Sequence, residues 1–288
     1  MKQFNRGIKN RAFIDALNEL RKDENSFWFK MVNDNDLFIA IRYEYINIYY
    51  LGQSICKLSY LKRGEAIKGE THKKYLGIDE SGYFNSKNGK ILSSKSIIRE
   101  LNDLSKIKEN VKNYIGNEKN KSYEVILNNE NQVIDTEVSF VDLNPNPKHK
   151  SQCQISSIDY VALEKGIENE INIVFYEAKH YCNSEIRSTK IPKVVDQINR
   201  YEKALKLHEE EYKQGIINTY KLVCKNLKDL GIVKNRNLIE RVNNSKLTID
   251  FQPKLIVFGF ETDVHARETW KEHKEKIENK LGKERLIF

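Results

Sequence analysis

Residues 155–181 read ISSIDYVALEKGIENEINIVFYEAKHY, and this stretch decides the predicted fold. Two runs rich in Ile, Val and Tyr, residues 155–163 and 171–181, are separated by a short charged segment around Gly166. This pattern predicts two adjacent strands of a β-hairpin. Successive side chains of a strand point to opposite faces, so Glu177 and Lys179 are expected to share one face of the second strand.

Charged residues occur where the hairpin is otherwise apolar. Asp159 lies in the first run, and Glu177 and Lys179 close the second. Burying such charges costs several kcal/mol unless they are paired or hold a metal ion. Three other Glu-x-Lys triplets occur in stretches of helical, solvated character, where a pair contributes about 0–1 kcal/mol; they begin at Glu211, Glu272 and Glu278. The triplet at Glu177 is therefore the one that calls for a chemical explanation.

Phosphodiester hydrolysis is a reaction that uses two carboxylates and a lysine together. Carboxylates bind Mg²⁺, a hard cation that prefers oxygen ligands. The metal ion lowers the pKa of a bound water and neutralises charge that develops on the phosphate. A lysine such as Lys179 can orient that water or offset phosphate charge. The backbone carbonyl of Ala178 is expected to complete the metal coordination.

The arrangement resembles that of the PD-(D/E)XK nuclease superfamily. Asp159 and the triplet at Glu177 are separated by 17 residues on a predicted hairpin, which a helix and a strand precede and a helix follows. The resemblance implies that Asp159 and Glu177 bind the metal ion, Mg²⁺ or Mn²⁺, and that Lys179 activates or positions the nucleophilic water. It covers roughly residues 100–260 and leaves the N-terminal third unexplained.

A second motif follows in the next predicted helix, where Gln197 and Tyr201 are similar to the Gln-x-x-x-Tyr element of the RecB-type branch. The i, i+4 spacing puts both side chains on one helix face. By resemblance they support the site and contact DNA phosphate; the alternative is that Tyr201 is an ordinary core residue. Arg187, Lys190 and Lys193 are candidate phosphate contacts, which an exposed basic loop would explain nearly as well.

Two features depart from the superfamily pattern. Asp159 follows Ile158 where the superfamily name implies a proline, although many members lack it. The additional acidic metal ligand, usually on the preceding helix, has no secure match. Glu124 fits a predicted helix and is preferred for topology, with Glu137, in the adjacent predicted strand, as the second choice.

The 288 residues predict two regions. Residues 1–95 are expected to form a β-rich region of unknown role after a short helix at 10–22, with an antiparallel sheet over 26–60 and loops or short elements over 62–95. Residues 96–288 are expected to form an α/β domain with a mixed central sheet flanked by helices, as in a restriction-endonuclease-like core. Its further elements are helices at 96–114, 123–129, 193–212, 213–250 and 266–281, and strands at 132–143 and 252–261.

Composition narrows the functional classes. The formal net charge is +8 and the isoelectric point is near 9.0, which favours a polyanionic partner. Among polyanions, DNA is the partner that the resemblance implies. Residues 1–10 lack a signal-peptide core, and no apolar run approaches the roughly 20 residues of a membrane span. Four scattered cysteines without a CxxC pair favour free thiols in the cytoplasm. We expect no interaction with a membrane, and the sequence is compatible with a homodimer.

The sequence therefore predicts a magnesium-dependent deoxyribonuclease that acts in phage defence, restriction or repair. One alternative is a nucleic-acid-binding module on a nuclease-like scaffold that no longer cuts. Another is a protein-interaction factor whose basic charge serves solubility. The tyrosines of the N-terminal region bear on the first alternative, because they can pack the sheet or stack on bases; they are Tyr43, Tyr45, Tyr49 and Tyr50.

Overall fold

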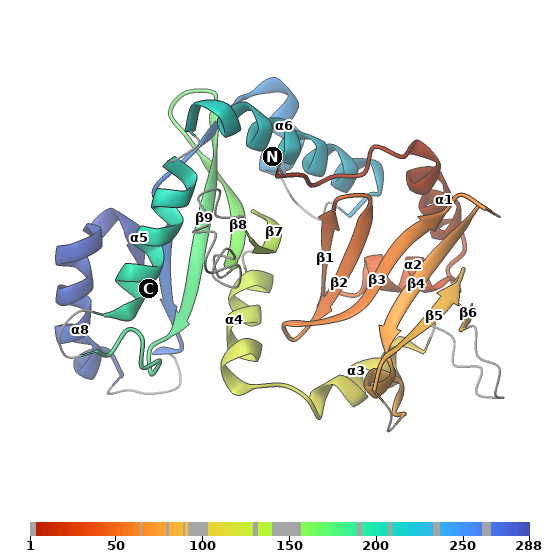
Figure 1. Ribbon diagram of the computed structural model, residues 1–288, viewed down its shortest axis with the longest axis horizontal. Coiled ribbons are helices and arrows are strands. Elements are labelled where there is room, and N and C mark those ends of the chain that lie inside the picture. Colours follow the sequence, from red (N-terminus) through yellow and green to blue (C-terminus); the bar gives the residue numbers. More distant parts are fainter. Residues whose placement is uncertain are drawn as a thin grey trace, which may run out of the picture. The chain divides into compact units, whose positions relative to one another are not determined.

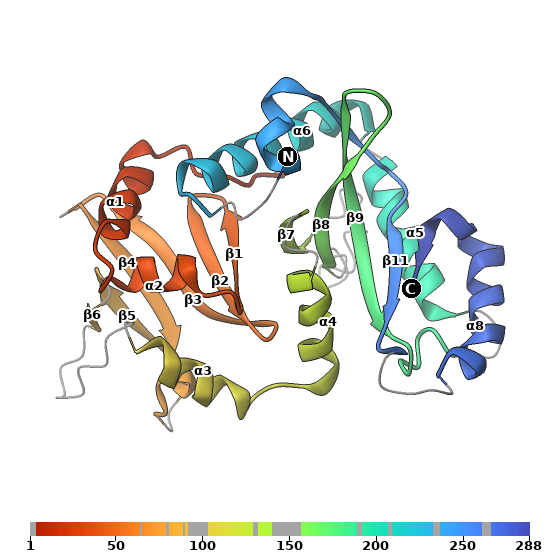
Figure 2. The ribbon, with the colours of Figure 1, turned by 180° about the vertical axis from the view of Figure 1, so that it is seen from behind.

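The computed structural model describes residues 4–63, 65–78, 81–88, 90–91, 103–128, 132–139, 157–188, 192–206, 209–232, 237–260 and 266–288. Within them the chain is mixed α/β, with eight α-helices and two six-stranded sheets (Figures 1 and 2). The predicted α/β class is thus confirmed.

The chain divides into two compact units. The antiparallel-sheet unit comprises Asn5–Tyr123 and Thr219–Asn235. The mixed-sheet unit comprises Glu124–Asn218 and Arg236–Phe288, together with the first four residues. The predicted boundary near residue 95 lies outside the described residues.

The antiparallel-sheet unit is a meander in which each strand pairs with the next along the chain. Its strands are β1 (Leu37–Arg42), β2 (Tyr45–Tyr50), β3 (Gln53–Leu61), β4 (Ala66–His72), β5 (Tyr83–Lys87) and β6 (Lys90–Ile91). The helical elements are α1 (Arg11–Arg21), α2 (Phe27–Asn33), the 3-10 helix η1 (Lys73–Leu76), α3 (Leu104–Lys112) and parts of α4 (Asn117–Asn128) and α6 (Glu209–Asp229).

One prediction for this unit is wrong. The stretch Phe27–Asn33 forms helix α2 rather than sheet, because Ser26 caps its first turn by accepting a hydrogen bond from the backbone N–H of Phe29 (3.1 Å). The buried side chains recur with helical spacing, at Phe27, Trp28, Met31 and Val32. Residues 62–95, expected to be loops or short elements, contain β4 and β5, whose outward positions are polar and so weaken the sequence signal.

The turn between β1 and β2 has no Gly or Asn to mark it. Glu44 adopts a positive φ of 57° there. Its carboxylate accepts hydrogen bonds from the backbone N–H groups of Lys9 (2.9 Å) and Asn10 (3.3 Å). These contacts hold a backbone conformation that most side chains avoid. Of the four tyrosines considered for base stacking, Tyr49 and Tyr50 at the far end of β2 are buried, whereas Tyr43 at this turn is 52% exposed.

The mixed sheet has the order β12-β11-β9-β8-β7, and β10 also pairs with β9. β8 and β9 form the predicted antiparallel hairpin, and β9 runs parallel to β10 and β11. The strands are β7 (Val133–Val138), β8 (Ile158–Lys165), β9 (Glu170–His180), β10 (Lys246–Ile249), β11 (Lys254–Phe258) and β12 (Leu286–Ile287). The sequence did not predict β10, in the stretch 213–250 expected to be helical, or β12; both are very short.

Helices α5 (Lys193–Lys206), α7 (Asn237–Arg241) and α8 (Ala266–Leu281) complete the mixed-sheet unit. Figures 1 and 2 show α5 and α8 beside the β9–β11 part of the sheet. A buried cluster joins them, with Ile198 from α5, Val257 from β11 and Ile277 from α8. Each such side chain contributes about 1.5–3 kcal/mol through burial. This core holds α5 firmly against the sheet face that carries the acids.

The hydroxyl of Tyr123 joins α4 to the antiparallel sheet and gives a test of this packing. It accepts a hydrogen bond from the N–H of Phe38 and donates to the carbonyl of Tyr49, both at 2.7 Å. We expect Tyr123→Phe to lower the free energy of unfolding by about 1–3 kcal/mol, because these buried groups lose their partner. The exposed Tyr114→Phe is the control, with a change within about 0.5 kcal/mol. Urea unfolding measures both, and equal midpoints for the two variants would contradict the packing.

Candidate active site

Strand register brings acidic residues into a row across β7, β8 and β9. Thr136 and Val138 of β7 pair with Tyr160 and Ile158 of β8, which places Glu137 opposite Asp159. Tyr160 pairs with Tyr176 of β9, so the next position along puts Asp159 opposite Glu177. Paired residues share a face of the sheet. The hairpin therefore presents the acids together, as the sequence predicted for Asp159 and Glu177.

Asp159 marks the point where the ladder between β8 and β9 ends. Its Oδ2 accepts a hydrogen bond from the backbone N–H of Ala178 at 2.7 Å. The N–H and carbonyl of a paired strand residue point toward the same neighbouring strand. The carbonyl of Ala178 is thus directed toward β8, the side from which Asp159 approaches; its role as a metal ligand stays a prediction.

Glu177 is buried, with 2% of its surface exposed. Its Oε1 accepts hydrogen bonds from Lys179 Nζ (2.8 Å) and Gln197 Nε2 (2.7 Å). Its Oε2 is buried and has no hydrogen-bond partner among the residues that the structure describes. An unpartnered buried carboxylate oxygen is costly, and oxygen is the ligand that hard divalent cations prefer. The residues present therefore fit a Mg²⁺ or Mn²⁺ ion.

Lys179 is held between two carboxylates. Its ammonium lies 2.8 Å from Glu177 Oε1 and 2.8 Å from Glu185 Oε2. The side chain keeps 14% of its surface exposed, and that of Glu185 keeps 41%, so solvent reaches this end of the site. Sequence analysis missed Glu185, which lies in the loop between β9 and α5 and belongs to no recognisable spacing.

The Gln-x-x-x-Tyr pair reaches the site as its helical spacing predicted. Gln197 donates from Nε2 both to Glu177 Oε1 and to the hydroxyl oxygen of Tyr201, each at 2.7 Å. The hydroxyl of Tyr201 donates to the carbonyl of Ser157 at 3.2 Å, next to β8. Tyr201 is fully buried. It is therefore a core residue whose hydroxyl orients the glutamine, and its contact with DNA phosphate stays a prediction.

The protonation equilibria of the site reflect its enclosure. Burial, followed by the negative charge of Glu177, raises the pKa of Asp159 to about 8. Burial also raises the pKa of Glu177, against the hydrogen bonds from Lys179 and Gln197. Burial opposes the charged form of Lys179, but the carboxylate of Glu177 outweighs it and raises the lysine pKa. A cation between the two acids would favour the ionised form of both.

Of the two candidates for a further acid, Glu137 lies nearer. Its charge contributes to the raised pKa of Asp159, and it has a positive φ of 47°. Glu124 is exposed on α4 and takes part in none of the interactions of the site given above. Within the described part of the chain, three or more His, Cys, Asp or Glu side chains do not gather into a metal-binding group. Two acids and the Ala178 carbonyl are therefore the core of any metal site here.

The predicted basic flank is only partly assembled. Arg187 donates to Thr269 of α8 at 3.2 Å and lies over the ring of Tyr181, with 5.8 Å from Cζ to the ring centroid. It is thus held against the core cluster. Lys193 is exposed at the start of α5. Lys190 lies outside the described residues.

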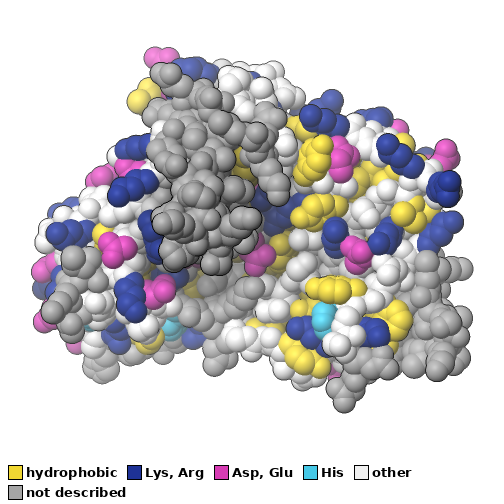
Figure 3. Space-filling view, in the orientation of Figure 1, with side chains coloured by type: hydrophobic (Ala, Val, Ile, Leu, Met, Phe, Trp, Pro, Cys, Tyr) yellow, Lys and Arg dark blue, Asp and Glu magenta, His cyan; other side chains and the backbone are white. Residues whose placement is uncertain are grey.

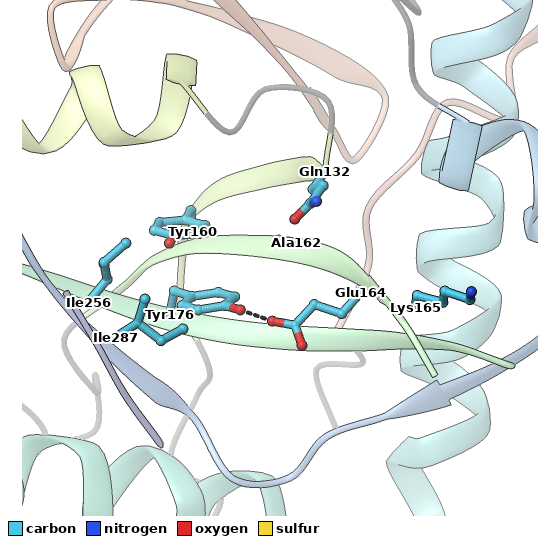
Figure 4. Close-up of a pocket in the computed structure, with 8 residues that line it drawn as sticks. All are labelled: Gln132, Tyr160, Ala162, Glu164, Lys165, Tyr176, Ile256 and Ile287. Atoms are coloured by element: carbon cyan, nitrogen blue, oxygen red, sulfur yellow. Dashed lines mark hydrogen bonds between the residues drawn. The ribbon is translucent and has the colours of Figure 1, made fainter. Parts of the chain in front are cut away.

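The opposite face of the mixed sheet carries a cavity of about 390 Å³, drawn in Figure 4. Tyr160 and Tyr176 stack across it with ring centroids 4.7 Å apart. The hydroxyl of Tyr176 donates to Glu164, whose other oxygen pairs with Lys254 at 2.7 Å. Because side chains alternate along a strand, this cavity is separated by the sheet from Asp159 and Glu177.

Comparison of the chain with known protein families, with curated proteins and with solved structures finds no significant match. No helix in the described ranges is long and apolar enough to cross a membrane. Cys56, Cys182 and Cys224 are free thiols, and Cys153 lies outside the described residues. The case for a function therefore depends on the site itself.

The raised pKa of Asp159 leads to a pH-dependent effect on stability. A carboxyl group whose pKa is higher in the folded than in the unfolded state stabilises the fold at low pH and loses that contribution as pH rises through about 4 to 8. Without divalent cations we expect Asp159→Asn to raise the free energy of unfolding by on the order of 2 kcal/mol at about pH 9, and by less at about pH 5.

Urea unfolding in EDTA at the two pH values measures this difference. Glu272→Gln on α8, an exposed acid-to-amide change, is the matched control with little effect. An equal gain at both pH values would show that ionisation of Asp159 does not oppose folding.

Proposed function

We propose that the mixed-sheet unit is a divalent-metal-dependent nuclease that hydrolyses phosphodiester bonds, with DNA as the substrate. The observation that carries the proposal is Oε2 of Glu177, which has no hydrogen-bond partner within the described residues and is buried beside Asp159 on one face of the hairpin. The order of elements supports it. Helix α4 and strand β7 precede the hairpin and α5 follows it, as the resemblance to the PD-(D/E)XK superfamily and its restriction-endonuclease-like core implies.

Each side chain has a separate task in this proposal. Asp159 and Glu177 would hold the metal ion, with the Ala178 carbonyl as a further oxygen donor. Gln197 keeps Glu177 in place, because it donates to Oε1 and leaves Oε2 available. When bound, Mg²⁺ or Mn²⁺ supplies Lewis-acid activation of a water and neutralises charge on the phosphate.

Lys179 provides the positive charge next to these acids. It is 86% buried at its side chain, and its ammonium is oriented by Glu177 and Glu185. In this position it can donate a hydrogen bond to an attacking water or to a phosphate oxygen, and its charge offsets the charge that accumulates in the transition state. Glu185, being the more exposed of its partners, is the one that a substrate phosphate would displace.

A second candidate function, nucleic-acid binding without cleavage, is favoured by the same ion pairs. The ammonium of Lys179 already bridges two carboxylates, an arrangement that stabilises the site without a metal ion. A lysine whose ammonium is held in structural ion pairs would not orient or activate an attacking water. The two functions differ in whether removal of the lysine charge abolishes cleavage.

Cleavage of plasmid DNA in the presence of Mg²⁺ or Mn²⁺ tests the proposal. We expect Glu177→Gln and Lys179→Met each to lower the cleavage rate by roughly 100-fold or more, because each removes a group that stabilises the transition state. EDTA should abolish cleavage in the unaltered protein. The measurement is the rate of conversion of supercoiled to nicked or linear DNA.

The chain contains matched controls, because Glu272 and Lys274 form another Glu-x-Lys triplet on α8. Glu272→Gln and Lys274→Met make the same chemical changes outside the site and should leave cleavage unchanged. Equal rates for the site variants and these controls would reject the nuclease assignment. DNA binding without any cleavage would favour the second candidate.

A further inference from the structure

The antiparallel sheet has one buried face and one open face along β3, β4 and β5. Leu58, Gly69 and Ser86 lie in register and are buried. The neighbouring positions pair on the other face, where side chains reach solvent. This surface, called the open face below, consists of Lys57, Lys68, Glu70, His72, Tyr83 and Lys87.

The open face is positively charged. Glu70 is the single acid in this set, and it is held between Lys57 (3.3 Å) and Lys68 (2.8 Å). Lys87 is exposed, and η1 adds Lys73 and Lys74 directly after β4. A surface with this excess of lysine attracts polyanions, and release of their counterions favours binding.

Aromatic rings lie among these lysines. Tyr83 is 68% exposed, and its ring contacts that of His72 edge-on at 5.0 Å. Beyond the strand, Lys74 lies over the rings of Tyr75 (4.9 Å) and Tyr114 (5.0 Å), and Tyr114 is 49% exposed. Figure 3 shows basic and hydrophobic side chains, tyrosine included, intermingled over this part of the unit.

Rings and cations in this arrangement match one class of ligand. An exposed ring on a sheet can stack on a base, and a lysine next to it can contact the adjoining phosphate. Bases in a duplex are stacked on one another and cannot offer their faces, whereas those of a single strand can. An acidic peptide would use the lysines and leave the exposed rings unused.

We propose that the open face, with the adjoining Lys74 and Tyr114, is a binding site for single-stranded nucleic acid. Tyr83 and Tyr114 stack on bases, and Lys74 and Lys87 contact phosphates. The inference goes beyond the proposed cleavage and does not depend on it, because every residue involved belongs to the antiparallel-sheet unit.

Fluorescence anisotropy of the full chain with a labelled oligonucleotide of about 15 nucleotides, in EDTA, tests the proposal. We expect Tyr83→Ala to weaken binding roughly 5- to 100-fold, the effect of losing one stacked base. Tyr83→Phe keeps the ring and should bind as the unaltered protein does. Lys87→Ala should reduce the magnitude of the slope of log K against the logarithm of the salt concentration by about 0.7, because that is the contribution of one phosphate contact to a single strand.

Tyr43→Ala is the matched control, because Tyr43 is 52% exposed in the same unit but lies at the β1–β2 turn. It should bind normally, and a duplex of the same sequence should bind more weakly than the single strand. Unchanged binding by Tyr83→Ala, or equal displacement of the strand by polyglutamate, would overturn the proposal. Because binding is measured in EDTA, where the proposed metal-dependent cleavage does not occur, a failure of cleavage is distinguishable from a failure of binding.

Discussion

The mixed-sheet unit depends on how it accommodates one buried carboxylate. Glu177 follows the buried run 173–176 of β9, where an unpaired charge would destabilise the fold by several kcal/mol. Lys179 and Gln197 satisfy one of its oxygens, and the other has no hydrogen-bond partner in the part of the chain that the structure describes. The core of α5 and α8 keeps Gln197 in position. These contacts allow the unit to fold around a buried carboxylate.

The alternation of side chains along each strand determines which residues share a face of each sheet. In the hairpin it places Asp159 and Glu177 on the face that α5 covers, and Tyr160 and Tyr176 on the face with the cavity. In the antiparallel sheet the same rule gives a buried face and an open face with lysine and tyrosine. The two units therefore differ: the mixed-sheet unit encloses its acids on the face that packs against α5, whereas the antiparallel-sheet unit carries exposed rings and cations on the face away from its core.

Local patterns made much of the fold predictable. The hairpin, the helix at 193–206 and the last helix all have long, regular runs of apolar residues, and the structure has them. Helix α2 was mistaken for sheet because aromatic residues favour strands in isolation, whereas the cap at Ser26 starts a helix. β4 and β5 lie in a stretch that the sequence predicted only as loops or short elements, because half of each strand faces solvent and carries polar residues.

By itself the sequence determined that Glu177 and Lys179 lie on one strand face and that Gln197 and Tyr201 lie on one helix face, because both follow from the repeat of a single element. Only the tertiary structure decided which groups of different elements meet. Glu185 reaches Lys179 through a loop, and Glu137 comes opposite Asp159 through strand register. Neither contact follows from the repeat of one element, because local spacing encodes neither the path of a loop nor the register between two strands.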